Sequence, residues 1–290
     1  MCHNCAVSAV TASRRSFARF LAVGAGLTVL TACTPVAPEA APPSSAPLPA
    51  APAPSPTVST APAAVPEAAP AGETPPAAAA TPSPSAALPR QFSLTDPASP
   101  WVVVNKHRPL APADYAPADL VSPAVGISAS GESALLNSTT AAAAEAMFAA
   151  ASRDGVVMVL ASGYRSYATQ VSTYNGYVAA RGQADADTAS ARPGYSEHQT
   201  GWSFDIADGG GACAFQPCFA EQPAAVWAKA NAHRFGFVVR YPWMFHETTG
   251  YYYEPWHLRY IGVEAATDMS ARGVATLEEY FGVGAAPGYH

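Results

Sequence analysis

The feature that most limits what this chain can fold into is a long stretch rich in proline and alanine. Of its 29 prolines, 18 lie between Pro35 and Pro97, and no Tyr, Trp or Phe occurs from position 34 to position 91. Such a stretch has too little apolar area to offset the entropy of ordering the chain, so we expect 33–97 to be an extended, largely disordered linker. The remaining roughly 190 residues, 98–290, suit one domain with its own core and exclude a two-domain enzyme of ordinary size.

The first 33 residues have the pattern of a lipoprotein signal peptide. Arg14 and Arg15 precede an apolar stretch at 20–30, which is too short to span a membrane as a stable helix. The arginine pair, followed by Phe17, resembles a twin-arginine export signal, and a general secretory signal is the alternative. The sequence LTAC, which ends at Cys33, resembles a bacterial lipobox. We therefore expect residues 1–32 to be removed and Cys33 to carry lipid.

This leader predicts an exported protein that is lipid-anchored to the outer face of the cytoplasmic membrane. A linker of roughly 60 residues at about 3.1 Å per residue in polyproline II would reach well over about 100 Å into the cell wall. The net charge of −6 and the absence of a Lys/Arg cluster argue against a nucleic-acid partner. We expect the protein to be a monomer.

Five cysteines are present, and two of them lie in the predicted domain. Cys2 and Cys5 belong to the leader, whereas Cys213 and Cys218 are close neighbours in an exported protein. This spacing favours a disulfide. The alternative, a pair of zinc-binding thiolates, lacks a second pair of ligands.

Residue periodicity in the domain predicts an α+β fold, in which a small, mainly antiparallel sheet is flanked by helices. Strands and helices mix without a strict βαβ repeat or a G-x-G-x-x-G turn. The predicted strands are 101–106, 156–160, 202–207, 237–239 and 251–253, and the predicted helices are 138–153, 166–182, 221–234 and 261–272.

Two histidines of this domain have neighbours that suggest chemistry. Six residues separate His198 from Asp205, and Gly201 between them permits the turn that brings the two side chains to one point. His257 follows Glu254 by three positions. In an unbroken strand these two would face opposite sides, but Pro255 interrupts regular pairing, so both can turn toward one cavity.

Two imidazoles and one carboxylate form the ligand set of a catalytic zinc site whose fourth position is open to water. Zinc lowers the pKa of its bound water to about 7, and a neighbouring carboxylate can take the proton as the water attacks a carbonyl. Taken alone, a His near an Asp is more often a surface or core pair than a pair of ligands.

Three segments together resemble the signature blocks of the VanY-type D-alanyl-D-alanine carboxypeptidases. They are 162–166 (SGYRS), 196–205 (SEHQTGWSFD) and 254–260 (EPWHLRY), in family order, and the resemblance extends to 104–106 (VNK). This family consists of zinc peptidases that share their fold with the Hedgehog signalling domain. The resemblance therefore implies a Hedgehog/DD-peptidase-like fold.

The resemblance also implies a role for each matching residue. His198, Asp205 and His257 would bind one zinc ion, and Glu254 would be the general base and later the acid toward the leaving amine. Arg165 would stabilise the charge that develops on the attacked carbonyl, because a fixed guanidinium near an oxyanion contributes strongly in a water-poor cleft. The alternative for Arg165 is a structural arginine paired with a carboxylate.

Further residues of these blocks are candidates for contact with the peptide. Ser196, Gln170 and Tyr164 are candidate substrate contacts, although a serine or glutamine can also cap or line a loop. Tyr195 and Trp256 could form walls of the pocket, but aromatic residues next to strands more often belong to the core.

The chain departs from the family pattern just before the ligand Asp205. Residues 202–204 (WSF) replace smaller aliphatic residues, which could reshape the floor of the site. Asp208 lies three residues beyond Asp205, and the three glycines after it indicate a turn residue rather than a ligand.

The predicted function is a zinc-dependent carboxypeptidase that removes the terminal D-alanine from peptidoglycan stem peptides. The nearest alternative is an L,D-carboxypeptidase that acts on the stem tetrapeptide, and a dipeptidase fits the wall-reaching linker less well. Other classes are a zinc-bearing module that binds wall peptides without cleaving them, or a structural wall anchor. Glu254 favours an enzyme, because a binding module needs no base beside its metal.

Overall fold

A computed structural model of the chain describes residues 88–290. The predicted signal peptide, the lipidation site Cys33 and most of the predicted linker lie outside these residues and stay predictions. Within 88–290, no helix is long and apolar enough to cross a membrane. The folded unit includes Leu94, ahead of the predicted boundary at residue 97, because Leu94 is buried in a core cluster with Trp101 and Ile261.

Four antiparallel strands form the central sheet, which confirms the predicted α+β class. The strand order is β3-β4-β6-β5, with β3 at Met158–Ser162, β4 at Ser203–Asp208, β6 at Glu254–Tyr260 and β5 at Phe237–Tyr241. A two-stranded sheet that the sequence did not predict pairs β1 (Leu120–Val121) with β2 (Leu136–Asn137).

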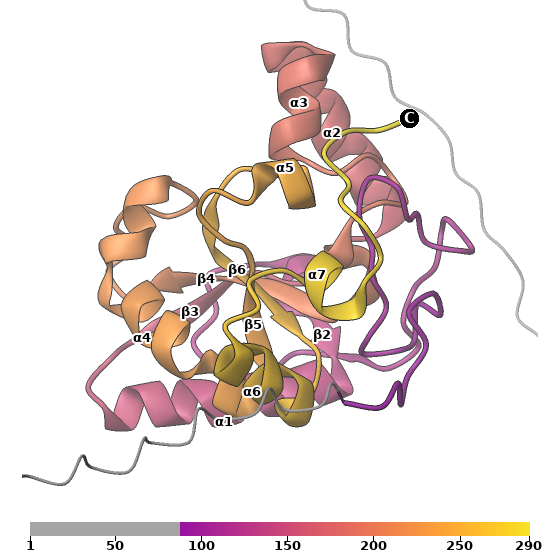
Figure 1. The fold of residues 1–290 in the computed structure, drawn as a ribbon. Coiled ribbons are helices and arrows are strands. Elements are labelled where there is room, and N and C mark those ends of the chain that lie inside the picture. Colours follow the sequence, from indigo (N-terminus) through magenta and orange to yellow (C-terminus); the bar gives the residue numbers. More distant parts are fainter. Residues whose placement is uncertain (1–87) are drawn as a thin grey trace, which may run out of the picture. The chain divides into compact units, whose positions relative to one another are not determined.

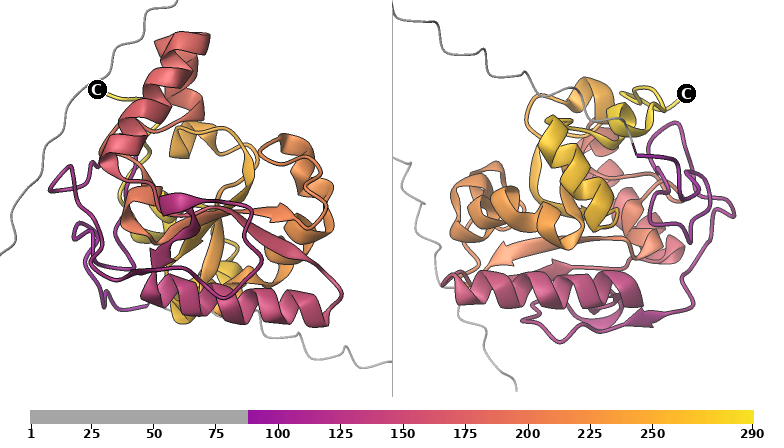
Figure 2. Two further views of the ribbon diagram at one scale, coloured as in Figure 1. Left: turned by 180° about the vertical axis from the view of Figure 1, so that it is seen from behind. Right: turned by 60° about the horizontal axis from the view of Figure 1, so that its bottom comes forward.

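Helices cover this sheet from two sides. In Figure 1, α1 runs along one side of the sheet, and the pair α2 and α3 projects from the opposite side; Figure 2 shows the same arrangement from two other directions. The helices are α1 (Ser138–Arg153), α2 (Tyr167–Arg181), α3 (Gln183–Ala189), α4 (Pro223–Asn231), α5 (His246–Thr249), α6 (Val263–Arg272) and α7 (Leu277–Phe281).

The first two long helices begin at polar caps. The side chain of Asn137 accepts a hydrogen bond from the backbone N–H of Thr140 (2.8 Å). The capping residue of α1 therefore lies directly before the predicted helix at 138–153. Ser166 caps α2 through Thr169 N–H (3.2 Å), and Gly182 ends this helix with a φ of 81°, both at the predicted positions.

The alternation of side chains along β4 and β6 divides the sheet into two chemically different faces. Phe204, Ile206 and Leu258 point into the main hydrophobic core against α1 and α4. Asp205 and His257 are therefore on the opposite face, because successive side chains in a strand point to opposite sides. The apolar face stabilises the sheet, and the other face is free for polar groups.

The predicted strand at 101–106 is wrong, although its residues are buried. Only Asn105 makes an isolated bridge, to Arg108. Trp101 and Val103 pack in one core cluster, while Val102 and Val104 pack in another. The segment forms no ladder because side chains occupy its carbonyls: Arg108 donates to Val103 O, and Arg259 donates to Val102 O.

The predicted strand at 251–253 is also wrong, since β6 begins at Glu254 and contains Pro255. The register between β5 and β6 shifts here: Val239 faces Leu258, but Tyr241 faces Glu254. This irregularity is the interruption that the sequence analysis expected at the proline, and it brings Glu254 to the same side as His257.

Other boundaries differ more modestly. The predicted helix at 221–234 is divided into α4 and a 3-10 turn at Ala232–Phe235, and the predicted strand at 156–160 begins two residues later, at Met158. The helix predicted at 261–272 is α6, but it is not the last, because α7 follows it. The predicted disulfide between Cys213 and Cys218 is present.

Candidate metal and peptidase site

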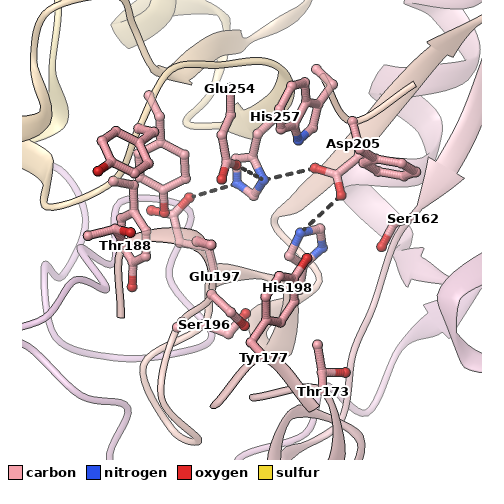
Figure 3. A pocket seen from close by; sticks show the side chains of 18 of the residues that line it. Ser162, Thr173, Tyr177, Thr188, Ser196, Glu197, His198, Asp205, Glu254 and His257 are labelled. Carbon is pink, nitrogen blue, oxygen red and sulfur yellow. Dashed lines mark hydrogen bonds and ion pairs between the residues drawn. The ribbon is translucent and has the colours of Figure 1, made fainter. Parts of the chain in front are cut away.

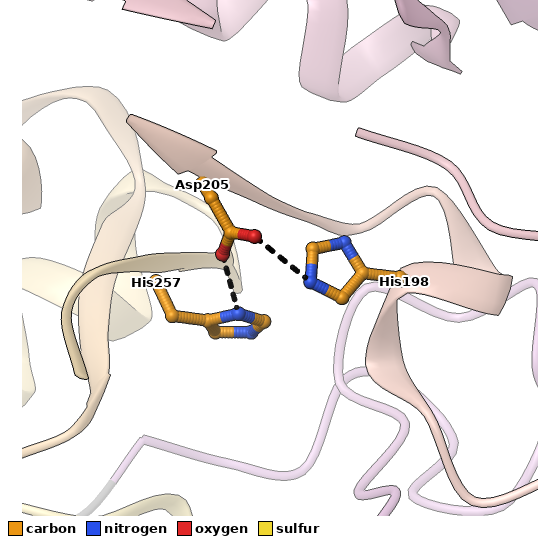
Figure 4. Close-up of side chains that lie close together, drawn as sticks. All are labelled: His198, Asp205 and His257. Carbon is orange, nitrogen blue, oxygen red and sulfur yellow. Dashed lines mark hydrogen bonds and ion pairs between the residues drawn. The ribbon is translucent and has the colours of Figure 1, made fainter. Parts of the chain in front are cut away.

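Three buried side chains converge on the polar face of the sheet. His198 comes from a 3-10 turn, η2 (Glu197–Thr200), while Asp205 and His257 face one another in the register of β4 and β6. One ligand atom from each lies within 4.8 Å of the others (Figure 4). Gly201 makes the turn into β4 with a φ of 69°, where a Cβ would lie 2.9 Å from the backbone nitrogen of Asn137.

The carboxylate of Asp205 bridges the two imidazoles. Its Oδ1 lies 2.9 Å from His257 Nδ1, and its Oδ2 lies 3.4 Å from His198 Nε2. Burial alone would raise the pKa of Asp205, but the two facing imidazoles hold it well below its usual value. Burial lowers the pKa of His198. Burial alone would also lower the pKa of His257, but the hydrogen bonds to Asp205 and Glu197 raise it to about 9 in the metal-free chain, so a metal ion must displace a proton there.

The second nitrogen of each imidazole is held by a group behind it. His198 Nδ1 lies 2.7 Å from the carbonyl oxygen of Gly163, so an N–H there leaves Nε2 free as a ligand atom. His257 Nε2 lies 3.4 Å from Glu197 Oε2, which leaves Nδ1 toward Asp205. Zinc-binding histidines are typically oriented by such a carbonyl or carboxylate, so this donor set fits a zinc ion.

Glu254 lies beside the three candidate ligands. Its Oε2 is 3.9 Å from His257 Nδ1, and its half-buried side chain lines the cleft (Figure 3). Burial raises the pKa of Glu254 to about 7, although His257 opposes this shift. A carboxyl with a pKa near neutrality can both accept and donate a proton, which suits general acid–base catalysis.

Arg165 lines the same cleft and is held in place by neutral groups. Its Nη1 donates to Gln170 Oε1 (3.1 Å), and its Nη2 donates to Ser162 Oγ (3.2 Å). Among residues 88–290 it forms no ion pair, so the alternative of a structural arginine paired with a carboxylate is not observed.

Two of the three candidate substrate contacts do not reach the cleft. Ser196 lines it, but Gln170 is fully buried, and its Nε2 donates to Ser190 Oγ and Ala191 O. Gln170 therefore positions Arg165 rather than the peptide. Tyr164 is buried away from the cleft and donates its backbone N–H to Leu135.

The remaining sequence candidates also separate by position. Trp256 lines the cleft, whereas Tyr195 packs edge to face against Tyr289, with the ring centroids 5.1 Å apart. Trp202 and Phe204 belong to core clusters and do not form the floor of the site. Asp208 is the last residue of β4, where it pairs with Met158, so it is not itself a turn residue; its Oδ2 accepts a hydrogen bond from the backbone N–H of Gly210 in the turn that follows.

The cleft encloses about 490 Å³, and several residues that line it were not singled out from the sequence. Tyr241 packs against His257 with the ring centroids 5.0 Å apart, and Phe215 forms part of the wall. Glu197 contacts the candidate ligand His257, with 3.4 Å between its Oε2 and His257 Nε2. Two features of the sequence could have pointed to Glu197. It lies next to His198 in the second block, and single arginines in mostly apolar strands need a buried carboxylate as a partner.

Comparisons with known proteins agree with this geometry. A family model described as "VanY: D-alanyl-D-alanine carboxypeptidase" matches residues 133–263. The Bacillus subtilis protein YodJ is 37% identical over 191 residues, which cover 65% of this chain and 69% of YodJ.

Solved structures of two enzymes are similar in fold and sequence. The LdcB LD-carboxypeptidase has a TM-score of 0.61 at 38% identity, covering 64% of this chain and 87% of that one. A vancomycin resistance D,D-pentapeptidase VanY in complex with Zn(II) has a TM-score of 0.52 at 33% identity, covering 62% and 97%. The chain belongs to the VanY-type D-alanyl-D-alanine carboxypeptidase family, with its DD-peptidase fold, and is a metallopeptidase by class.

Proposed function

We propose that this chain is a zinc-dependent carboxypeptidase that removes the C-terminal D-alanine from peptidoglycan stem peptides. The observation that carries the proposal is the buried set His198, Asp205 and His257, with Glu254 at 3.9 Å from the last of these, in one cleft. The Zn(II) complex of the related VanY and the D-alanyl-D-alanine activity in the family name support the metal and the substrate.

The three ligands would hold one zinc ion, which when bound would polarise a carbonyl and lower the pKa of water. Glu254 takes the proton from the attacking water on its carboxylate and then delivers it to the nitrogen of the departing D-alanine. Its pKa of about 7 suits both transfers, because neither protonation state is strongly favoured at neutral pH.

Arg165 stabilises the oxygen of the attacked carbonyl as negative charge develops on it. Its guanidinium donates hydrogen bonds to Ser162 and Gln170, two neutral groups that hold it in place. A preorganised cation of this kind contributes mainly in the transition state. Ser196, which lines the cleft next to Glu197, is a contact for the terminal residue of the peptide.

A second candidate is L,D-carboxypeptidase activity on the stem tetrapeptide. The similarity to the LdcB LD-carboxypeptidase, at 38% identity and a TM-score of 0.61, favours it. Both activities release a C-terminal D-alanine, so they differ in the configuration of the residue before the cleaved bond, which is a D-residue in the pentapeptide and an L-centre in the tetrapeptide.

One experiment tests both candidates. The purified chain is incubated with a stem pentapeptide and a stem tetrapeptide, and released D-alanine is measured with zinc, with chelator, and with chelator followed by zinc. Zinc-restored release from the pentapeptide supports the D,D-activity. Release from the tetrapeptide alone would replace it with the L,D-activity, and no release from either would refute both.

We also propose that the enzyme is exported and anchored through lipid on Cys33. The LTAC sequence and the proline-rich stretch behind it support this proposal. Wild type should be recovered in the membrane fraction and Cys33→Ser in the soluble fraction. Equal recovery of both in the membrane fraction would contradict the lipid anchor.

A further inference from the structure

A buried cluster of charges lies directly behind the candidate ligand His257. Glu197 Oε2 lies 3.4 Å from His257 Nε2, and its Oε1 accepts hydrogen bonds from Arg240 Nε (2.7 Å) and Arg259 Nη1 (2.9 Å). The side chains of Glu197 and both arginines are fully buried. The position of Glu197 is therefore determined by the two arginines.

Arg240 is itself held by a second carboxylate. Its Nη1 and Nη2 donate to Glu278 Oε2 (2.9 Å) and Oε1 (2.7 Å), a paired geometry that fixes the guanidinium plane. Asn105 Nδ2 donates to Glu278 Oε1 at 3.0 Å. The connected path thus runs from His257 through Glu197 and Arg240 to Glu278 and Asn105.

The last two members of this path, Glu278 and Asn105, lie outside the segment that matches the family model. That match covers 133–263, whereas Asn105 precedes it and Glu278 is in α7, beyond it. The charges are balanced, since two arginines face two glutamates. Removing the carboxylate of Glu278 would leave the buried Arg240 without the partner that fixes its guanidinium. Arg240 would then no longer hold Glu197 in one position.

The sheet explains why these distant residues meet. Arg240, His257 and Arg259 are all on the face of β5 and β6 opposite the hydrophobic core, as Phe237 and Leu258 on the same strands point into that core. Glu197 approaches this face from η2, and α7 closes it from the far end (Figure 1). The charged side chains of this cluster are buried behind the candidate metal site.

We infer that Glu278 and Asn105 are positioning residues for the metal site, which act through Arg240 and Glu197 to keep His257 Nδ1 directed at the metal. This inference rests on the zinc site of the proposed function, because it assigns these residues an effect on metal binding. Carboxylates that orient a ligand histidine typically contribute about 10- to 100-fold in metal affinity.

Zinc affinity, measured by competition with a chromophoric chelator, tests the inference without any peptide. Glu197→Gln should weaken zinc binding by about 10- to 100-fold, and Glu278→Gln by a smaller factor, because its effect passes through Arg240. The double variant should weaken binding by less than the product of the two factors, since both act on one path. The cobalt-substituted variants should show altered absorption bands.

Asp187→Asn is a control, because it removes a carboxylate that pairs with Arg192 (2.8 Å) and accepts from Tyr174, but within residues 88–290 makes no hydrogen bond or ion pair with Glu197, Arg240 or Glu278. It should leave zinc affinity unchanged. Asn105→Ala is a milder variant that keeps the buried charges balanced, so it tests the far end of the path should Glu278→Gln fold poorly. It should weaken zinc binding by a few-fold.

A purely structural role makes a different set of predictions. If Glu278→Gln and Asn105→Ala lower the melting temperature but bind zinc as wild type does, the inference is refuted while the proposed function stands. If wild type binds zinc but releases no D-alanine, the proposed function fails while the positioning role stands. If the losses of zinc affinity in the two single variants multiply fully in the double variant, a shared path is also refuted.

Discussion

The floor and the rim of the cleft are built in opposite ways. The floor, made of His198, Asp205, His257 and Glu197, is buried on paired strands and one tight turn, and each side chain has at least two polar partners. The rim includes Phe215 and Tyr252, which are 51% and 62% exposed. The floor is therefore fixed by polar partners that the fold brings together, whereas the side chains of the rim are open to solvent.

The rim residue Phe215 is held by local constraints instead of by a core. The disulfide between Cys213 and Cys218 closes the loop that carries it, and both Cys213 and Phe215 adopt a φ of 56°. Non-glycine residues in this region are uncommon and often occur at functional sites. Phe215 meets Trp256 edge to face, with the ring centroids 6.1 Å apart.

The largest effect should come from Glu254, which lines the cleft beside the candidate ligand His257. Glu254→Gln should reduce D-alanine release by about 10²- to 10⁴-fold, because the amide cannot accept the proton of the attacking water. Zinc content should not change, since Glu254 is not one of the three ligands. Metal analysis of the purified variant and the release assay check both statements.

Glu247→Gln is the matched control for this variant, because the side chain of Glu247 is 82% exposed and does not line the cleft. It should release D-alanine at the wild-type rate. Full activity of Glu254→Gln would contradict the assignment of the base.

A smaller loss is expected for Arg165, which lies between floor and rim. Arg165→Ala should lower kcat by about 10²- to 10³-fold, the range for loss of one oxyanion-stabilising group. Gln170→Ala should lower it by less, because Arg165 would keep its bond to Ser162. Steady-state kinetics on the pentapeptide check this order, and an Arg165 variant that changes KM alone would contradict a transition-state role.

The same Glu254 that serves catalysis should destabilise the metal-free fold above neutral pH. Its pKa is about 7 in the folded chain and 4.5 in an ordinary carboxyl, so the folded state keeps a proton that the unfolded state loses between these pH values. The unfolding free energy should therefore fall as pH rises from about 4.5 to 7, by at most about 3 kcal/mol.

Glu254→Gln lacks this titration, so in chelator it should be more stable than wild type at pH 8, and the difference should shrink toward pH 4. Thermal unfolding of both proteins across this pH range provides the measurement. Parallel stability curves would show that the burial of this carboxyl has no energetic consequence.

The smallest effect should come from the rim. Phe215→Ala should raise KM by about 2- to 10-fold with little change in kcat, which corresponds to the loss of one aromatic contact with the peptide. Phe92→Ala removes a comparably exposed ring that does not line the cleft and should leave KM unchanged. A fall in kcat for Phe215→Ala would contradict a role in peptide binding alone and would indicate a role in the chemical step.

Local patterns predicted the parts of this fold that depend on near neighbours. Helix α2 is bounded by Ser166 and Gly182, the two ends that the sequence predicted. The short spacing of Cys213 and Cys218 predicted their disulfide. The strand at 101–106 was wrong because its β-branched run resembles a strand, yet the nearby Arg108 and the distant Arg259 occupy two of its carbonyls. No local pattern contains that information.

The sequence likewise predicted some residues of the candidate site and misassigned others. The two blocks around His198 and His257 predicted three metal ligands and a base, and the structure brings these four side chains together. Gln170 was assigned to the substrate, but the structure shows that it holds Arg165 instead. Its role could not be read from residue type, because an amide serves equally well in either position.

The residue types and spacing of the sequence, with the resemblance of its blocks to a known family, indicated that His198, Asp205 and His257 converge on one point. The groups that lie behind these residues follow from the tertiary structure. Glu197 and Arg240 are 43 positions apart, and Arg240 and Glu278 are 38 apart. Their pairing depends on strand order and on the packing of α7, because buried charges are stabilised only where the whole fold brings opposite charges into contact.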